Sequence, residues 1–227
     1  MKIQCIIPAR GGSKGITNKN IVNFCGKPLI AWTIEQCKSS NKVSNVWVSS
    51  DDDDILDIAL EYGAKTIKRP KTISGDNATS ESAWLHALDY LYSSGVRVDI
   101  VLAPQATSPL REELDINKAI DKFIEGNYDS MFSASVANDL FFWEESDSGF
   151  ISPGYDYKNR QRRQELNQDK FIENGSFYIF KPSILQANSN RLGGKIGYSL
   201  MDFWKMFEID EPDDLKMCSA LMKEFLI

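Results

Sequence analysis

The sequence is poor in histidine and cysteine, and this scarcity excludes several kinds of active site. A single histidine, His86, cannot supply a histidine-based zinc site and argues against a Ser-His-Asp triad, so we interpret it as a structural or surface residue. The four cysteines show no Cys-x-x-Cys spacing, and we expect them to be reduced and structural: Cys5, Cys25, Cys37 and Cys218. Any chemistry must therefore rest on a metal ion, on cationic side chains and on positioning.

The chain also lacks long apolar runs and an excess of positive charge. It has no run of roughly 18 apolar residues, and its N-terminus leads directly into a strand pattern, so we expect a cytoplasmic protein without a membrane partner. With 26 basic and 32 acidic residues the net charge is −6, which argues against nucleic acid as a partner. A chain of 227 residues with 42% hydrophobic content can bury one core, so we expect a single domain over residues 1–227.

What the sequence does contain, first of all, is a glycine-rich and basic loop. The apolar residues 3–7 are followed by Pro-Ala-Arg-Gly-Gly-Ser-Lys-Gly at residues 8–15, and then by Lys19 and Asn20. The glycines let the backbone turn tightly and bring its N–H groups near a ligand. The loop cations suit the several negative charges of a nucleoside triphosphate. The spacing fits neither a Walker A loop nor a dinucleotide-binding fingerprint.

Strand and helix patterns alternate along most of the chain. Strands are expected at residues 3–7, 46–48, 66–67, 99–103, 130–136, 175–180 and 196–201. Helices are expected at residues 28–39, 55–62, 80–92 and 114–123, and from Pro212 onward. This βαβ rhythm predicts an α/β fold, with a mostly parallel, Rossmann-like sheet flanked by helices.

The rhythm breaks at about residue 140. The aromatic residues 141–143 and the apolar residues 150–151 predict a hairpin around residues 147–149, and residues 152–170 are polar and basic. Apolar side chains on such an excursion, which we place at residues 138–172, need cover from another surface. We therefore expect a second subunit and a homodimer.

Two acidic runs have different interpretations. Residues 51–54, four aspartates, follow a strand and open a helix, where carboxylates cap free N–H groups. Glu208 and Asp210 instead alternate along an extended segment, so both side chains project to one side. Hard carboxylate oxygens of this kind bind Mg²⁺ together with substrate phosphates, which predicts a magnesium site. Asp213 and Asp214, in the first helical turn after Pro212, are expected to be caps.

Four motifs together resemble the N-acylneuraminate cytidylyltransferases, also called CMP-sialic acid synthetases. They lie at residues 8–20, at Gln-Ala-Thr-Ser-Pro over 105–109, at residues 162–164 with 173–178, and at Ile209-Asp210. In that family CTP and a nine-carbon 2-keto sugar acid give the CMP-sugar and pyrophosphate, on a nucleotidyltransferase-type fold. The resemblance also implies a dimer in which the excursion reaches the partner's active site.

The resemblance implies roles for particular residues of this sequence. Nucleotide-binding positions are Arg10, Gly11, Gly12, Ser13, Lys14, Asn20, Arg69, Ala78 and Ser80. Catalytic positions are Lys19, Arg160 and Asp210. Sugar-binding positions are Gln105, Arg163 and Asn174. The implied cofactor is Mg²⁺ on Asp210, with Glu208 standing where many relatives have aspartate.

The chemistry of such a transfer agrees with these residue types. The anomeric 2-hydroxyl of the sugar acid attacks the α-phosphorus and pyrophosphate leaves in line, so charge neutralisation and alignment matter more than a covalent nucleophile. N-acetylneuraminate is the expected acceptor, and legionaminate and the deaminated sialic acid stay open as alternatives. The related eight-carbon enzymes usually carry an Arg-x-Pro-Gly-Lys arrangement that is absent here. A nucleotide-binding regulator without turnover is the alternative from another class, and Asp210 with the basic residues 158–163 argues against it.

Overall fold

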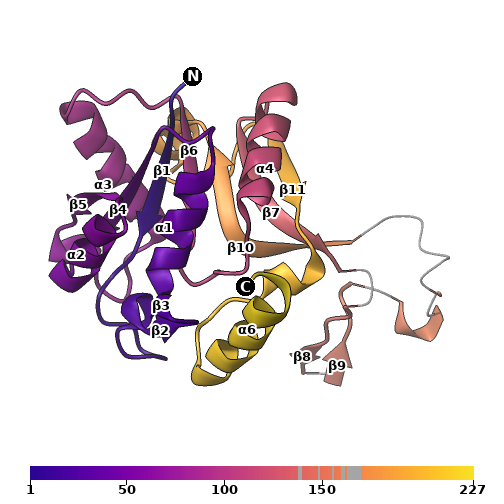
Figure 1. Ribbon diagram of the computed structural model, residues 1–227. Coiled ribbons are helices and arrows are strands. Elements are labelled where there is room, and N and C mark those ends of the chain that lie inside the picture. The colour runs from indigo at the N-terminus through magenta and orange to yellow at the C-terminus, as the bar shows by residue number, and fades with distance from the viewer. Residues whose placement is uncertain (138–139, 148, 155, 160–161, 163–169) are drawn as a thin grey trace.

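The computed structural model describes all residues except 138–139, 148, 155, 160–161 and 163–169. Its centre is a seven-stranded sheet in the order β11-β7-β10-β6-β1-β4-β5 (Figure 1). All neighbours are parallel except β10, which is antiparallel to both β6 and β7. The strands are β1 (Ile3–Pro8), β4 (Asn45–Ser50), β5 (Lys65–Lys68), β6 (Ile100–Pro104), β7 (Ser130–Val136), β10 (Phe171–Phe180) and β11 (Ile196–Leu200). The mostly parallel sheet predicted from the sequence is confirmed.

Helices cover both faces of this sheet. Cys5 and Ile7 of β1 pack in the cluster of α1, α2 and α4, whereas Ile6 packs in the cluster of α3 and α5. The strand alternates between two apolar layers because successive side chains point to opposite faces. The helices are α1 (Leu29–Ser39), α2 (Asp53–Glu61), α3 (Ser80–Ser93), α4 (Glu113–Glu125), α5 (Pro182–Asn188) and α6 (Pro212–Phe225).

A third apolar cluster lies at the carboxyl ends of the strands. It joins Leu29 of α1 and Cys218 of α6 to Phe24, Leu110 and Ile209. Figure 1 shows α6 and the small hairpin of β2 (Asn23–Phe24) and β3 (Lys27–Pro28) at this end of the molecule. The C-terminal helix is therefore packed against the N-terminal part of the chain.

The expected elements are found with boundaries shifted by a few residues, apart from the excursion. Its hairpin exists, but the first strand is β8 (Glu144–Ser146) rather than residues 141–143, and it pairs with β9 (Gly149–Ile151). The predicted position of the first strand was wrong. Ser146 pairs with Gly149, so the turn between them fixes which residues face each other, and it places Glu144 rather than an aromatic residue opposite Ile151. The sequence patterns also missed α5, β2 and β3, which are short.

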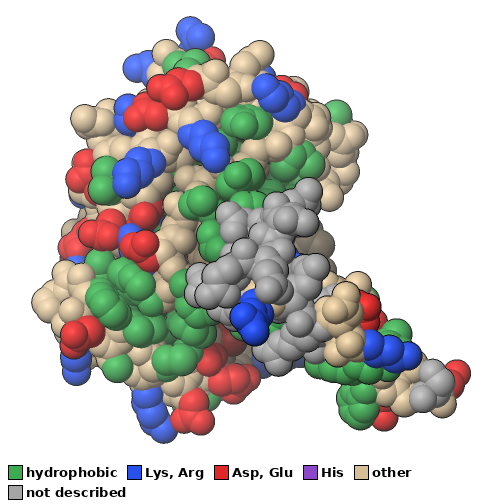
Figure 2. All heavy atoms as spheres, turned by 90° about the vertical axis from the view of Figure 1, so that its right-hand side faces the viewer, with side chains coloured by type: hydrophobic (Ala, Val, Ile, Leu, Met, Phe, Trp, Pro, Cys, Tyr) green, Lys and Arg blue, Asp and Glu red, His purple; other side chains and the backbone are tan. Residues whose placement is uncertain are grey.

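The hairpin and the two residues before it expose large apolar side chains. Phe142 is 62% exposed, Trp143 45% and Phe150 69%. Figure 2 shows the hairpin as a lobe that projects from the body of the molecule, with hydrophobic side chains on its surface. Within the described residues, no helix has both the length and the apolar character needed to cross a bilayer.

Candidate active site

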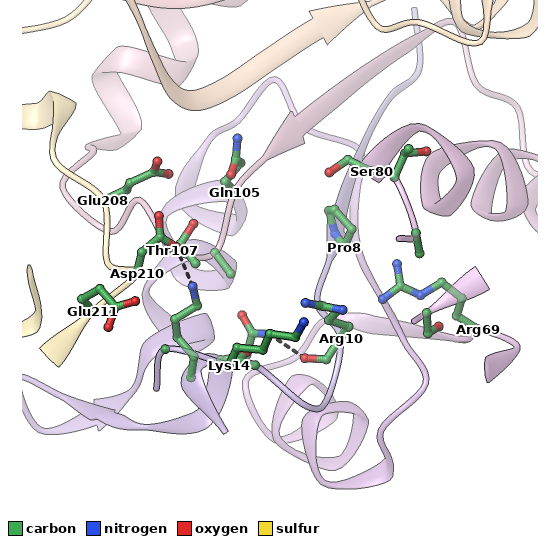
Figure 3. A pocket seen from close by; sticks show the side chains of 18 residues that line it. Pro8, Arg10, Lys14, Arg69, Ser80, Gln105, Thr107, Glu208, Asp210 and Glu211 are labelled. Atoms are coloured by element: carbon green, nitrogen blue, oxygen red, sulfur yellow. Dashed lines mark hydrogen bonds and ion pairs between the residues drawn. The ribbon is translucent and has the colours of Figure 1, made fainter. Parts of the chain in front are cut away.

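A cavity of about 520 Å³ opens at the carboxyl ends of the parallel strands (Figure 3). The residue that ends β1, the segment after β6, the residues that precede α3 and the segment before α6 all contribute to its wall. In an open α/β sheet this edge is where ligands bind. The wall consists of Pro8, Arg10, Ser13, Lys14, Gly15, Lys19, Asn20, Arg69, Ser74, Ala78, Thr79, Ser80, Gln105, Ala106, Thr107, Glu208, Asp210 and Glu211.

Most of the sequence-predicted site residues meet in this wall. Gly11, Gly12 and Asn174 are outside it, and Arg160 and Arg163 lie outside the described residues. Sequence reasoning did not single out several wall residues: Pro8, Ser74, Thr79, Ala106, Thr107 and Glu211. Pro8, Ala106 and Thr107 lie within the sequence motifs but were given no role of their own, and Ser74 and Thr79 lie outside every motif. Glu211 could have been found because it directly follows Asp210.

The glycine-rich loop is held by hydrogen bonds within the protein. The Gly11 N–H donates to Asp51 Oδ1 at 3.1 Å, so it faces this carboxylate and not the cavity, contrary to the expectation for this loop. Asn20 is buried, and its Nδ2 donates to the carbonyl of Arg10 at 2.9 Å. Gly12 has a φ of 65°, a conformation that side chains disfavour. These contacts shape the loop so that Arg10, rather than the neighbouring amide, faces the cavity.

Within the aspartate run at the start of α2, Asp52 is the cap that the sequence predicts and Asp53 and Asp54 lie in the first helical turn, whereas Asp51 binds the glycine-rich loop. Asp52 is the N-cap residue, and its side chain accepts a hydrogen bond from the Ile55 N–H at 3.2 Å. A Cβ on Gly11 would lie 2.7 Å from Asp52 Oδ2, so the loop passes directly over this helix start. Asp51 and Asp52 thus anchor the glycine-rich loop to the end of β4.

The N-terminal loop and the segment before α6 meet in the wall of the cavity. Lys19 Nζ lies 2.6 Å from Asp210 Oδ1, and the Ile209 N–H donates to the Thr107 carbonyl at 2.8 Å. In Figure 3, Glu208, Asp210 and Glu211 form one side of the cavity, across from Arg10 and Arg69. A cationic side and an acidic side therefore face each other across one space.

Gly15 makes this convergence possible. A Cβ at this position would collide with the carbonyl oxygen of Asp210 and would lie 2.8 Å from Glu211 Oε1. Only a residue without a side chain lets the loop pass this close to the acidic segment. The glycine therefore places the loop directly against the acidic segment.

The cations of the cavity differ in their partners. Arg10 and Lys14 both pair with the carboxylate of Asp76, at 3.0 Å and 2.8 Å. Arg69 is buried and lines the same cavity as Ala78 and Ser80, and burial lowers its pKa, an effect that the charge of Asp51 partly opposes. Polar and cationic groups thus line the side of the cavity opposite the acidic pair.

A second cavity of about 390 Å³ shares Gln105 and Glu208 with the first. Its other lining residues are Ile172, Glu173, Asn174, Gly175, Tyr178 and Met206. Asn174 is tied down, because its Nδ2 donates to Ser135 Oγ at 3.1 Å and its Oδ1 accepts the Ser176 N–H at 3.2 Å. The two cavities form adjoining compartments, with Gln105 at their boundary.

Tyr178 and Glu173 form a short hydrogen bond in the second cavity. The Tyr178 hydroxyl donates to Glu173 Oε1 at 2.5 Å. Burial and this hydrogen bond raise the pKa of Tyr178 to about 12. The phenol is therefore a neutral donor at physiological pH. Both residues lie in the sequence motif over 173–178, but the motif did not predict that their side chains pair.

A buried arginine supports the boundary between the cavities. Arg111 is fully enclosed and donates to the carbonyls of Gln105 and Ser108 at 2.5 Å and of Ser176 at 2.9 Å, and to Thr33 Oγ1 at 3.1 Å. Its fork of donors ties the segment after β6 to β10. Nothing in the sequence pattern marks this residue as more than a helix-flanking cation.

Glu208 and Asp210 have the donor chemistry for a magnesium ion. Burial and the charge of Asp210 raise the pKa of Glu208, and a divalent cation between the carboxylates would relieve that repulsion. Among the residues that the structure describes, no group of three or more His, Cys, Asp or Glu side chains could hold a metal. Mg²⁺ commonly uses one or two carboxylates together with substrate phosphates, so this pair fits that mode of binding.

Two proteins with related sequences are named as cytidylyltransferases. Pseudaminic acid cytidylyltransferase of Campylobacter jejuni is 38% identical over 184 residues, which cover 79% of this chain and 78% of that protein. N-acylneuraminate cytidylyltransferase A of Danio rerio is 34% identical over 206 residues, covering 87% of this chain and 46% of that protein.

The fold has solved counterparts. The structure of CMP:2-keto-3-deoxy-manno-octonic acid synthetase complexed with CTP matches with a TM-score of 0.74 at 18% identity, covering 100% of both chains. At this identity the likeness shows the fold alone. The profile of the family described as Cytidylyltransferase matches residues 4–145. The resemblance seen in the sequence motifs is thereby confirmed, and this chain belongs to the cytidylyltransferase family.

Proposed function

We propose that this protein transfers CMP from CTP to the anomeric 2-hydroxyl of a nonulosonic acid, a nine-carbon 2-keto sugar acid, and releases pyrophosphate. The observation that carries the proposal is the single cavity in which a cationic loop faces an acidic pair, with Lys19 Nζ 2.6 Å from Asp210 Oδ1. Membership of the cytidylyltransferase family supplies the class of nucleotide. One catalytic domain over residues 1–227 accounts for both cavities.

The first cavity is proposed as the CTP site. Arg10, Ser13 and Lys14 bind the triphosphate, and Asn20 orients Arg10 through the hydrogen bond to its carbonyl. Gly11 and Gly12 act through the shape of the loop. The buried guanidinium of Arg69, with Ala78 and Ser80 beside it, fits the cytidine end of the nucleotide. Lys19 neutralises charge near the α-phosphate, where it also contacts Asp210.

The second cavity is proposed as the sugar-acid site. Gln105 lies at its boundary with the CTP site and orients the acceptor hydroxyl toward the α-phosphorus. Asn174 and the Tyr178–Glu173 pair provide polar groups for the sugar. Arg160, as a catalytic residue, and Arg163, as a sugar-binding residue, are proposed from the family resemblance.

Asp210 and Glu208 are proposed as the carboxylates that hold Mg²⁺. When bound there, the ion supplies Lewis-acid polarisation of the α-phosphate. The protein groups contribute alignment of the two substrates and neutralisation of the charge on the departing pyrophosphate. Lys14 and Arg10 are the described residues placed to bind that charge.

N-acetylneuraminate and pseudaminate are the two acceptors that observations favour. The four sequence motifs support the first, and the Campylobacter jejuni relative at 38% identity supports the second. The test is pyrophosphate release from CTP and Mg²⁺ with a panel of sugar acids, ranked by kcat/KM: N-acetylneuraminate, pseudaminate, legionaminate, the deaminated sialic acid and the eight-carbon acid. Equal consumption of CTP without any sugar acid would refute the proposal. Binding of CTP without product across the panel would favour a regulator.

A further inference from the structure

The carboxylate of Asp76 pairs with two cations, Arg10 and Lys14, that line the cavity proposed for CTP. It lies in the segment between the 3₁₀ turn at Lys71–Ile73 and α3, and it bridges Arg10 and Lys14. Its oxygens are 3.0 Å from Arg10 Nη1 and 2.8 Å from Lys14 Nζ. An anion that belongs to the protein therefore engages both cations.

Both ion pairs are open to solvent, so another anion can replace Asp76 as the partner of Arg10 and Lys14. The side chains of Arg10, Lys14 and Asp76 are 33%, 74% and 52% exposed, so water and salt compete with each pair. The hydrogen bonds from Lys14 and Arg10 lower the pKa of Asp76, which is therefore ionised at neutral pH. A polyphosphate that binds the same cations would lie beside this negative charge.

We propose that Asp76 is an internal counter-anion of the nucleotide site, which competes with polyphosphate for Arg10 and Lys14 and so weakens the binding of CTP and of pyrophosphate. The inference rests on the proposed function, in which those two cations hold the triphosphate. Its consequence for turnover is that pyrophosphate leaves more easily, at the cost of a higher Kd for CTP.

The test is calorimetric titration of CTP and of inorganic pyrophosphate, without sugar acid or metal, into the protein of residues 1–227 and its Asp76→Asn variant. Loss of one negative charge beside the polyanion is expected to tighten both ligands about fivefold at low salt, and less at high salt. Cytidine, which has no phosphate, is expected to bind both proteins equally. The matched control is Asp121→Asn, because Asp121 is 51% exposed and pairs with Lys42 at 2.7 Å on another surface.

The partner cations provide a second measurement. In a Lys14→Met background the gain from Asp76→Asn is expected to shrink, because one of the two contested cations is gone. Unchanged or weaker pyrophosphate binding by a folded Asp76→Asn protein would overturn the inference, and weaker binding would mean that Asp76 orients the cations instead. Failure of the wild-type protein to bind CTP even after Mg²⁺ is added would overturn the proposed function itself. Thermal unfolding of each variant checks that it is folded.

Discussion

Lys19 and Asp210 are 191 positions apart in the sequence, yet their side chains meet with Nζ 2.6 Å from Oδ1. Lys19 is only 15% exposed in this pair, whereas Asp210 is 59% exposed and open to the cavity. The pair joins the N-terminal loop to the segment before α6. It brings a positive and a negative group to the place where we propose the transfer.

The first prediction concerns this pair. Asp210→Asn is expected to lower kcat by about 100-fold or more, because it removes a charge that we propose binds the metal. Its melting temperature is expected to stay near that of the wild type, because the side chain is largely exposed. Asp213→Asn is the matched control: this carboxylate is 92% exposed in the same segment and pairs with Lys216. Wild-type turnover in Asp210→Asn would remove the metal proposal.

The second prediction concerns Gly15. Gly15→Ala is expected to reduce the free energy of unfolding by about 1–3 kcal/mol and to weaken CTP binding, because the new Cβ would collide with the Asp210 carbonyl. Gly75→Ala is the control for stability, because nothing lies within 4 Å of a Cβ there. Urea unfolding and CTP titration measure the two effects. Equal stability of the two alanine variants would contradict the close packing of the loop.

The third prediction concerns Arg111. Arg111→Met is expected to destabilise the protein by about 3 kcal/mol or more, since it leaves several buried carbonyls without donors. Arg111→Lys keeps the charge but loses the fork geometry, so we expect an intermediate loss and a raised KM for the sugar acid through misplacement of Gln105. Arg97→Lys, at a side chain that is 75% exposed, is the control and should change little. An unchanged KM in a folded Arg111→Lys protein would show that the residue has a structural role alone.

The fourth prediction is a pH dependence that arises from Tyr178. Because its pKa is raised to about 12 in the folded state, the unfolded chain releases this proton first as the pH rises above 10. Folding stability is therefore lost between about pH 10 and 12, by up to about 1.4 kcal/mol per pH unit. Tyr178→Phe lacks this titration, so the stability difference between wild type and variant should narrow from pH 9 to pH 11. Denaturant unfolding at both pH values measures it, and a constant difference would refute the assignment.

The fifth prediction concerns the exposed hairpin. We propose a homodimer through residues 138–172, because Phe142 and Phe150 are 62% and 69% exposed. Phe150→Glu is expected to shift the protein toward a monomer in analytical ultracentrifugation. Leu60→Glu is the control, at a side chain that is 56% exposed on α2. A monomeric wild-type protein would contradict the proposal.

Much of the fold could be predicted because local patterns carry it. Ser130–Val136 was predicted with its observed boundaries, and α3 within one residue, because apolar patterns mark both elements and Gly95 marks the end of α3. The β8 strand was misplaced because a two-stranded hairpin takes its register from its turn, which aromatic content does not reveal. The sequence did not predict that β10 is antiparallel to its neighbours, because the apolar pattern of a strand does not indicate the direction in which the strand runs in the sheet.

By itself, the sequence determined the alternation of strands and helices, the loop of glycines and cations, and the acidic pair on one side of an extended segment. These are local properties, set by the spacing of residue types. Only the tertiary structure decided that Gly15 lies against Asp210, that Arg111 joins Gln105 to β10, and that Asp76 engages Arg10 and Lys14. Such contacts join residues far apart in the chain, and they depend on how the helices pack against the two faces of the sheet.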